Sequence, residues 1–168
     1  MTPNQEKLHD IAVADLHKRG VEVSDIAKLV LFLQKDYIKD LQEAECENSV
    51  EVVLRKREVQ NVIITGIQLD VLTEKHQLDE PLQSILTEDE GLYGIDEIMA
   101  LGIVNVYGSI GFTNYGYIDK VKPGILAILN AHEPGKIHTF LDDIVGAIAA
   151  AAASRLAHAH PEEEDDIY

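Results

Sequence analysis

The chain has 168 residues, and 30 acidic side chains against 14 Lys and Arg give it a formal net charge of −16. This length suits one domain. A protein with so negative a charge repels nucleic acid and anionic lipid. We therefore expect no nucleic-acid partner and at most peripheral membrane contact. The longest apolar run, residues 144–153, is shorter than the roughly 18 residues of a transmembrane span. The chain has a single cysteine, Cys46, and shows no signal-peptide pattern. These features predict a soluble protein of the reducing cytoplasm.

Apolar residues recur with helical spacing along the first half of the chain. The pattern predicts a first helix that follows Pro3 and ends at Gly20, a residue that tolerates the left-handed closing conformation. A second helix is predicted over residues 24–41, with a serine as its N-cap. A third is predicted over residues 48–76, because a capping-box spacing begins there.

The helical pattern continues in the second half, where glycines and prolines interrupt it. A helix over residues 92–106 is preferred to a strand over 103–107, because no second strand candidate is present to pair with it. The glycines at 108, 111 and 116 predict a break or a tight crossing. The other helices are predicted over residues 81–86, 118–122, 123–130 and 139–158.

The last predicted helix is apolar on all sides over residues 144–153. A helix that has no face for water belongs in the middle of its fold, so we expect five or more amphipathic helices around it. The sequence therefore predicts an all-α fold with a central apolar C-terminal helix. The helical domain is expected over residues 1–160, with its motif-bearing half at about 93–153, and residues 161–168 are expected to be a disordered acidic tail.

Three acidic spots stand in apolar or glycine-rich surroundings in the second half of the chain. They are Asp96 with Glu97, Asp119, and Asp142 with Asp143. Hard cations such as Mg²⁺ bind carboxylates, water and substrate phosphate, so acids that converge from separate helices would form a metal site. Spacing by itself does not establish that these acids converge.

Each acid also has an ordinary structural interpretation. Asp142 lies three residues after Thr139 and fits a capping box, with Asp143 favouring the helix dipole. Asp119 is placed to pair with Lys122 one turn later. The first acidic pair suits the first turn of a helix or an exposed surface. From spacing alone, a helix-start role is the more frequent one for the two adjacent aspartates.

Three segments occur in the order of three motifs, and they read YGIDEIMALG, YIDKVKPG and GKIHTFLDDIVGAIAAA. From about Tyr93 to Ala153 the chain resembles the phosphatidylglycerophosphatase A family, in the soluble Gram-positive branch similar to low-temperature-requirement C proteins. The family motifs read approximately Trp-Asp-Glu, Asp-x-x-Lys-Pro, and Gly-x-Gly followed by Asp-Asp. The chain differs by Ile95 at the Trp position and Gly116 at a usual Arg position, and it lacks the N-terminal motif of the membrane-embedded members.

The resemblance implies a Mg²⁺-dependent phosphatase that hydrolyses the phosphomonoester of phosphatidylglycerophosphate or a related substrate, in phospholipid metabolism. The predicted metal ligands are the motif acids Asp96, Glu97, Asp119, Asp142 and Asp143. Lys122 would neutralise phosphate oxygens. His138 would protonate the leaving group, because a histidine has an ordinary pKa of about 6.5, although an exposed loop residue is an equal alternative for it.

A second hypothesis is a non-catalytic metal-binding helical protein with a structural or regulatory role. The missing Arg and N-terminal motif favour this alternative, whereas the retention of every acidic motif position favours the enzyme. Besides a phosphomonoester substrate, we expect a homo-oligomer that forms through an amphipathic face such as residues 24–41.

Overall fold

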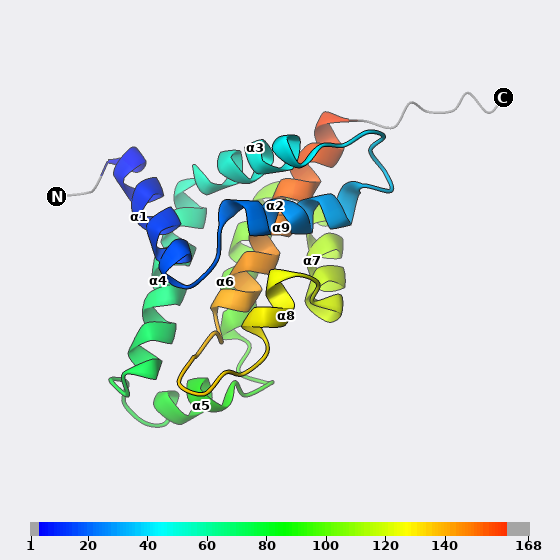
Figure 1. Cartoon of the computed structure of the whole chain (residues 1–168). Coiled ribbons are helices and arrows are strands. Elements are labelled where there is room, and N and C mark those ends of the chain that lie inside the picture. Colours follow the sequence, from blue (N-terminus) through cyan, green and yellow to red (C-terminus); the bar gives the residue numbers. More distant parts are fainter. Residues whose placement is uncertain (1–3, 161–168) are drawn as a thin grey trace.

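The computed structural model describes residues 4–160, which form helices and connecting loops without a strand (Figure 1). The helices are α1 (Gln5–Lys18), α2 (Val23–Gln34), α3 (Glu43–Leu54), α4 (Arg57–Glu74), α5 (Leu82–Glu88), α6 (Ile95–Val104), the 3₁₀-helix η1 (Asn105–Tyr107), α7 (Ser109–Val121), α8 (Ile125–Leu129) and α9 (Leu141–Ala159). The predicted all-α class is confirmed. Among these described helices, none combines the length and apolar character needed to cross a bilayer. The tail predicted at 161–168 lies outside the described residues, and the homo-oligomer stays a prediction.

Helix α9 runs through the centre of the molecule, as Figure 1 shows. It packs against α2, α3, α4, α6, α7 and α8, and all its residues from Leu141 to Ser154 are buried. Helix α4 approaches α9 closely at Gly66, where an added Cβ would lie 2.3 Å from Cδ1 of Ile144. The predicted central apolar C-terminal helix is confirmed.

Helix boundaries in the first half differ from the prediction. Helix α2 ends at Gln34, so its predicted continuation is wrong, and Tyr37 is 73 % exposed. The predicted third helix is two helices, because α3 begins at a capping box on Gln42 and the helix is interrupted at residues 55–56 before α4. Asn48 therefore lies inside α3. The earlier start lets α3 bury one more turn, which contains a buried cysteine.

The second half corrects the predicted breaks. The strand considered over residues 103–107 is excluded, because α6 and η1 cover this stretch. Helix α7 continues through Gly111 and Gly116, so a break at those two glycines is wrong, and the helix begins after Gly108, which has φ of 80°. Gly111 has a packing reason instead: an added Cβ would lie 3.0 Å from Cγ1 of Val104.

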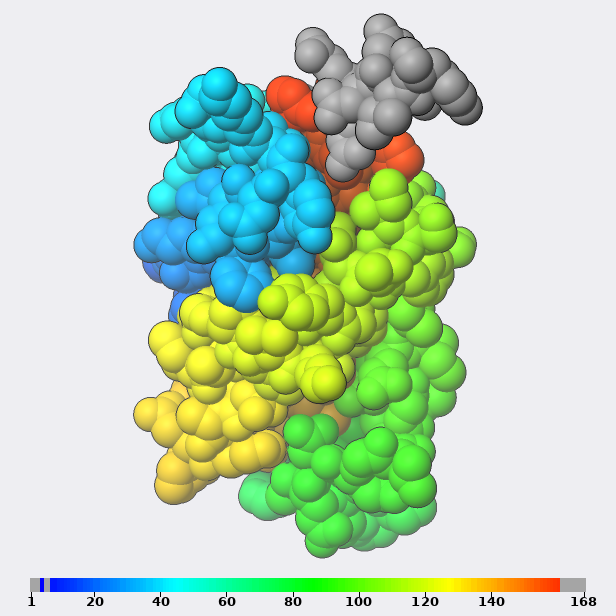
Figure 2. Space-filling model, turned by 90° about the vertical axis from the view of Figure 1, so that its right-hand side faces the viewer, coloured from blue at the N-terminus to red at the C-terminus, as the bar shows by residue number. Residues whose placement is uncertain are grey.

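The start of α9 is reached from the surface through a narrow opening. Figure 2 shows its orange residues only at the bottom of a gap between the yellow segment that contains α8 and the green α5–α6 region. Residues from the end of α5, from α8 and from the segment that precedes α9 line this opening, together with Asp142. The fold thus places the third acidic motif at the bottom of a hollow.

Candidate active site

Helix α9 is capped by a residue of another helix. Asp70 on α4 accepts hydrogen bonds from the backbone N–H groups of Phe140 and Leu141, each at 3.0 Å. The Thr139 hydroxyl instead donates to a carbonyl of α5 at 2.8 Å. The capping-box interpretation of Thr139 and Asp142 is therefore wrong. The Asp142 carboxylate instead accepts the backbone N–H of its neighbour Asp143 on Oδ1, at 2.8 Å.

Two of the predicted motifs meet at this helix start. The Nζ atom of Lys122 donates to Oδ1 of Asp119 at 3.0 Å and to Oδ2 of Asp142 at 3.2 Å. Lys122 closes α7 in the left-handed conformation, with φ of 47°. Burial raises the pKa of Asp142, and the neighbouring Lys122 opposes that rise. Burial lowers the pKa of Lys122, but Asp142 and Asp119 outweigh it, so the ammonium holds its proton more firmly than usual.

Asp143 brings the remaining motif into the site. The Tyr115 hydroxyl of α7 donates to Oδ1 of Asp143 at 3.0 Å. Burial raises the pKa of Asp143, and the charges of Asp142 and Asp96 and a hydrogen bond with Asp96 raise it further. Carboxylates held this closely resist being ionised together. Asp96, Asp119, Asp142 and Asp143 therefore converge, and we call these four residues the acidic cluster.

Glu97, the fifth predicted ligand, lies at the edge of this cluster. Glu97 is exposed on the first turn of α6. Burial and Asp143 raise the pKa of Tyr115 above its ordinary range, and the Glu97 charge adds to that rise, so Glu97 faces the site without being enclosed by it. The structure brings four of the five predicted acids together and leaves Glu97 at the rim.

Asp89, at the C-terminal end of α5, is an acid of this site that the sequence analysis missed. Burial and the Asp96 charge raise its pKa, whereas His132 and Lys122 lower it, and its own charge raises the pKa of Asp142. Asp89 adopts the left-handed conformation, with φ of 49°, which an aspartate tolerates better than most residues. The run of acids at residues 88–90, after the predicted short helix, was the available signal.

The acidic cluster fits Mg²⁺ in donor type and in charge. Its donors are all carboxylate oxygens, which hard cations prefer, and buried like charges are stabilised by a cation. Within residues 4–160, no three His, Cys, Asp or Glu side chains are grouped closely enough to hold a metal ion in the present arrangement. The ammonium of Lys122 lies between two of the carboxylates. A metal ion would therefore take over oxygens of Asp119 and Asp142 that Lys122 now neutralises.

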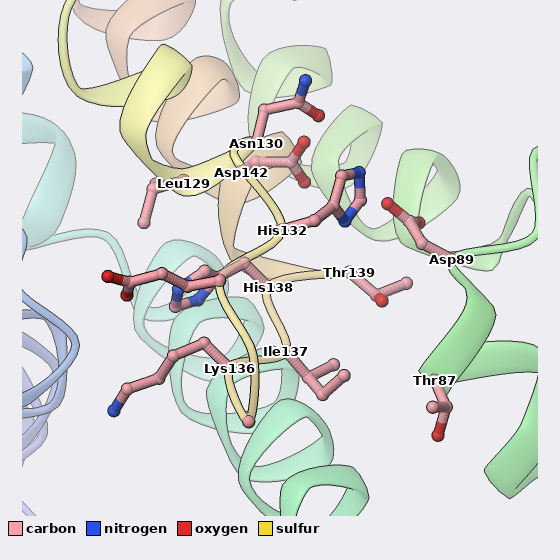
Figure 3. Close-up of a pocket in the computed structure, with 12 residues that line it drawn as sticks. Thr87, Asp89, Leu129, Asn130, His132, Lys136, Ile137, His138, Thr139 and Asp142 are labelled. Atoms are coloured by element: carbon pink, nitrogen blue, oxygen red, sulfur yellow. The ribbon is translucent and has the colours of Figure 1, made fainter.

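A hollow of about 250 Å³ opens beside Asp142, and Figure 3 shows the residues that line it. His132, Asp89 and Asp142 lie on one side of the segment that leads into α9, and Lys136 and His138 point to the other side. His132 is exposed, and its charge interacts with that of Asp89. The hollow offers room for a phosphate-bearing group next to the acidic cluster.

His138, the predicted proton donor, contacts Arg19 and not the acidic cluster. Its Nδ1 atom lies 3.2 Å from an Nη atom of Arg19, which also pairs with Glu74 of α4. Burial and the Arg19 charge lower the pKa of His138, so the ring is mostly neutral at neutral pH. Its predicted role in proton transfer stays a prediction. The His138 side chain lies beside Arg19, on the side of the segment before α9 that faces away from Asp142.

The fold and the site define an all-helical protein that gathers carboxylates from three helices at the start of α9, beside a hollow that Asp142 lines. A family model for phosphatidylglycerophosphatase A matches residues 14–158. The chain belongs to the phosphatidylglycerophosphatase A family, and the match extends well beyond the motif-bearing half.

Relatives and solved structures agree with this assignment. The chain is 67% identical over 147 residues to the Bacillus subtilis protein YutG, covering 88% of this chain and 89% of YutG. The crystal structure of the low temperature requirement C protein from Listeria monocytogenes superposes with a TM-score of 0.91 at 67% identity, over 94% of this chain and 99% of that one. A protein of unknown function from Bacillus stearothermophilus gives a TM-score of 0.88 at 66% identity, over 90% and 94% of the two chains. The predicted family and branch are confirmed.

Proposed function

We propose that the protein is a Mg²⁺-dependent phosphatase that hydrolyses the terminal phosphomonoester of phosphatidylglycerophosphate or a closely related substrate. The observation that carries the proposal is the convergence of three separate sequence motifs at the start of α9, through Asp96, Asp119, Asp142 and Asp143, beside a hollow that Asp142 lines. Asp70 supplies the cap of α9, so capping does not explain why the Lys122 ammonium and the Tyr115 hydroxyl bind Asp142 and Asp143.

The residues of the site have distinct roles in this proposal. The acidic cluster would hold the metal, and when bound Mg²⁺ polarises a phosphate group and lowers the pKa of an attacking water. Tyr115 orients the carboxylate of Asp143 through its hydroxyl. Lys122, which now binds Asp119 and Asp142, would neutralise phosphate oxygens with its ammonium once those acids hold the metal.

Protonation of the leaving oxygen is assigned to a histidine of the hollow. His138 is the residue named from the sequence, and His132 lines the same hollow on the side of Asp89 and Asp142. Replacing each in turn by Gln separates them: the proton donor is the histidine whose loss lowers kcat and removes its pKa from the pH–rate profile.

Phosphate release tests the proposal directly. Purified protein is incubated with phosphatidylglycerophosphate and with soluble phosphomonoesters, in Mg²⁺ and in EDTA. We expect release from the lipid in Mg²⁺ and none in EDTA. No release from any substrate would contradict the enzyme and support a non-catalytic metal-binding role.

A further inference from the structure

Exposed large hydrophobic side chains gather on one stretch of the chain. Among the residues that the structure describes, ten such side chains are exposed, and nine of them lie within residues 92–128, from the loop before α6 to α8. Leu92 and Ile98, for example, are 92% and 62% exposed. Single exposed hydrophobic residues are common on protein surfaces, but a concentration of this kind is typical of a surface that binds a partner.

The same stretch is almost free of charge. Charged residues make up 26% of the whole chain, whereas residues 98–118 contain none, and residues 76–119 contain neither Lys nor Arg. The cores of protein interfaces are depleted of charged residues and enriched in aromatic ones. This stretch also supplies Phe112 and Tyr117 as exposed rings. Its composition and its exposure therefore both indicate a protein interface.

The uncharged residues form one surface in the fold. Helices α6 and α7 pack against each other, against η1 and against α9, so their exposed sides face outward together. In Figure 2 the green residues of the α5–α6 region and the yellow-green residues of α7 lie side by side on one face of the molecule. We call the exposed surface of this uncharged stretch the α6–α7 face, and it is formed by Ile98, Gly102, Val106, Phe112, Gly116 and Tyr117.

Two glycines of the α6–α7 face have no packing reason within the chain. Gly102 and Gly116 are exposed inside their helices, and an added Cβ at either would have no atom within 4 Å. The helical glycines at 66, 111 and 146 do have neighbours within that distance. Glycine is less stable than alanine inside a helix, so a glycine that is not crowded from within needs another reason. The backbone of a second protein molecule that approaches closely supplies one, whereas fluid acyl chains pack equally well on alanine.

A second copy of the chain fits the α6–α7 face better than a bilayer does. Each copy has a net charge of −16, so two copies repel each other unless they meet where charges are absent. A two-fold axis places the same patch on both sides of a contact, so one uncharged face meets another. Surfaces that adsorb to membranes instead combine apolar side chains with Lys and Arg, and residues 76–119 contain neither.

The apolar side of α2, which the sequence offered for oligomerisation, is not available. Its residues Ile26, Leu29 and Val30 are buried, because α2 packs against α3 and α9. An oligomer of this protein therefore needs a different surface.

We propose that two copies of the protein form a symmetric dimer through the α6–α7 face, in which helices of the two copies approach closely at Gly102 and Gly116. The dimer does not depend on the proposed function. Glu97 directly precedes the uncharged stretch and Asp119 directly follows it. The interface therefore holds the two helices that carry Asp96 and Asp119 of the acidic cluster.

Sedimentation equilibrium of the full chain tests the dimer and its surface. We expect wild type to dimerise, and Ile98→Lys/Val106→Lys to raise the dimer Kd about a hundredfold, because four like charges meet at the contact. The added lysines reduce the net negative charge, so a general increase in repulsion cannot cause this loss. The matched control, Tyr37→Lys/Ile128→Lys, changes two exposed hydrophobic residues outside the α6–α7 face and should keep the wild-type Kd within about twofold. A monomeric wild type, or an equal loss in both variants, would overturn the proposal.

The glycines provide a second variant that favours the helical fold. Alanine stabilises helices and has open space at both positions, so Gly102→Ala/Gly116→Ala should melt above wild type at dilutions where both proteins are monomeric. The same variant should raise the dimer Kd about tenfold, because each added Cβ separates the two copies. An unchanged Kd would contradict close approach at the glycines.

Salt and vesicles separate a second copy from other partners. Added NaCl should lower the dimer Kd, because it screens the repulsion between two chains of charge −16. A dimer that weakens with salt would contradict an uncharged contact. Sedimentation with phosphatidylcholine–phosphatidylglycerol vesicles gives the alternative: vesicle binding by a monomeric wild type that Ile98→Lys/Val106→Lys loses would assign the face to lipid and overturn the dimer.

Discussion

Three buried aspartates, Asp70, Asp142 and Asp143, meet at the start of α9, and their carboxylates have different hydrogen-bond partners. Asp70 accepts a backbone N–H on each of its two oxygens. Burial raises its pKa to about 8, against these two bonds and the Arg19 charge, which stabilise the ionised form. Asp142 accepts the backbone N–H of Asp143 on Oδ1 and the Lys122 ammonium on Oδ2. Asp143 accepts the Tyr115 hydroxyl, and further acids face both residues.

The comparison separates an acid with a structural role from the acids that we propose bind the metal. Asp70 uses both carboxylate oxygens on the two N–H groups that open α9. Both oxygens of Asp142 are also bonded, but one of them binds an ammonium that Asp119 shares. The acidic cluster brings more negative charge together than Lys122 neutralises, which raises the free energy of the metal-free state. This excess charge is what a bound cation would relieve. Loss of Asp70 should therefore damage the fold, and loss of a cluster acid should damage activity.

Replacing Asp142 by Asn should have the largest effect on activity. The variant removes one carboxylate of the acidic cluster but keeps the shape of the side chain. We expect phosphate release to fall by at least about a hundredfold, because metal ligation contributes several kcal/mol to transition-state stabilisation. Asp36→Asn, at an exposed position of the same charge, should keep wild-type activity. An unchanged rate in Asp142→Asn would remove this residue from the site.

Replacing Asp70 by Ala should have the largest effect on stability. Two buried backbone N–H groups would lose their acceptor, and we expect the free energy of unfolding in urea to fall by about 2–4 kcal/mol. Asp70→Asn keeps one acceptor oxygen and should lose about half as much. Equal stability of wild type and Asp70→Ala would mean that α9 does not depend on this cap.

A smaller effect is expected in the pH dependence of stability. The pKa values of Asp142 and Asp143 are raised in the folded protein, by burial first and then by neighbouring acids. Groups whose pKa is raised on folding keep protons that the unfolded chain releases above about pH 4, so stability falls as pH rises above that value. In EDTA we expect the melting temperature to decrease from about pH 5 to pH 8. Asp143→Asn should flatten this decrease, whereas Asp36→Asn should not, although both remove one charge.

Sequence patterns identified the fold class and the residues of the acidic cluster, but not the contacts that hold them. The apolar 144–153 segment required a central helix, and ordered motifs singled out Asp142 and Asp143. The cap of α9 was out of reach, because Asp70 lies 70 residues before Phe140 in the chain. Asp89 was missed for a related reason: its role depends on a left-handed turn that brings it beside helices far away in the sequence.

Helix boundaries failed where local signals were repeated. Several capping spacings occur in the first half, and only packing decides which of them starts a helix. Helix α3, for example, has Gln42 as its N-cap and not Asn48. The contacts of His138 are likewise decided by packing and not by the local sequence. The ordinary pKa of a histidine suggested a proton donor, whereas the contact with Arg19 is fixed by the packing of the end of α1 against this segment.

Thermal melting with and without Mg²⁺ tests the central claim most directly. Wild type is compared with Asp142→Asn/Asp143→Asn and with the control Asp36→Asn/Asp79→Asn, which neutralises two exposed acids. Because neutralisation removes like-charge repulsion, we expect the cluster variant to melt above both other proteins in EDTA. Since a metal that binds only the folded state adds RT ln(1 + [L]/Kd), millimolar Mg²⁺ should stabilise wild type and the control but not the cluster variant. A wild type indifferent to Mg²⁺, with a cluster variant less stable than wild type in EDTA, would contradict the account and return both aspartates to a purely structural role.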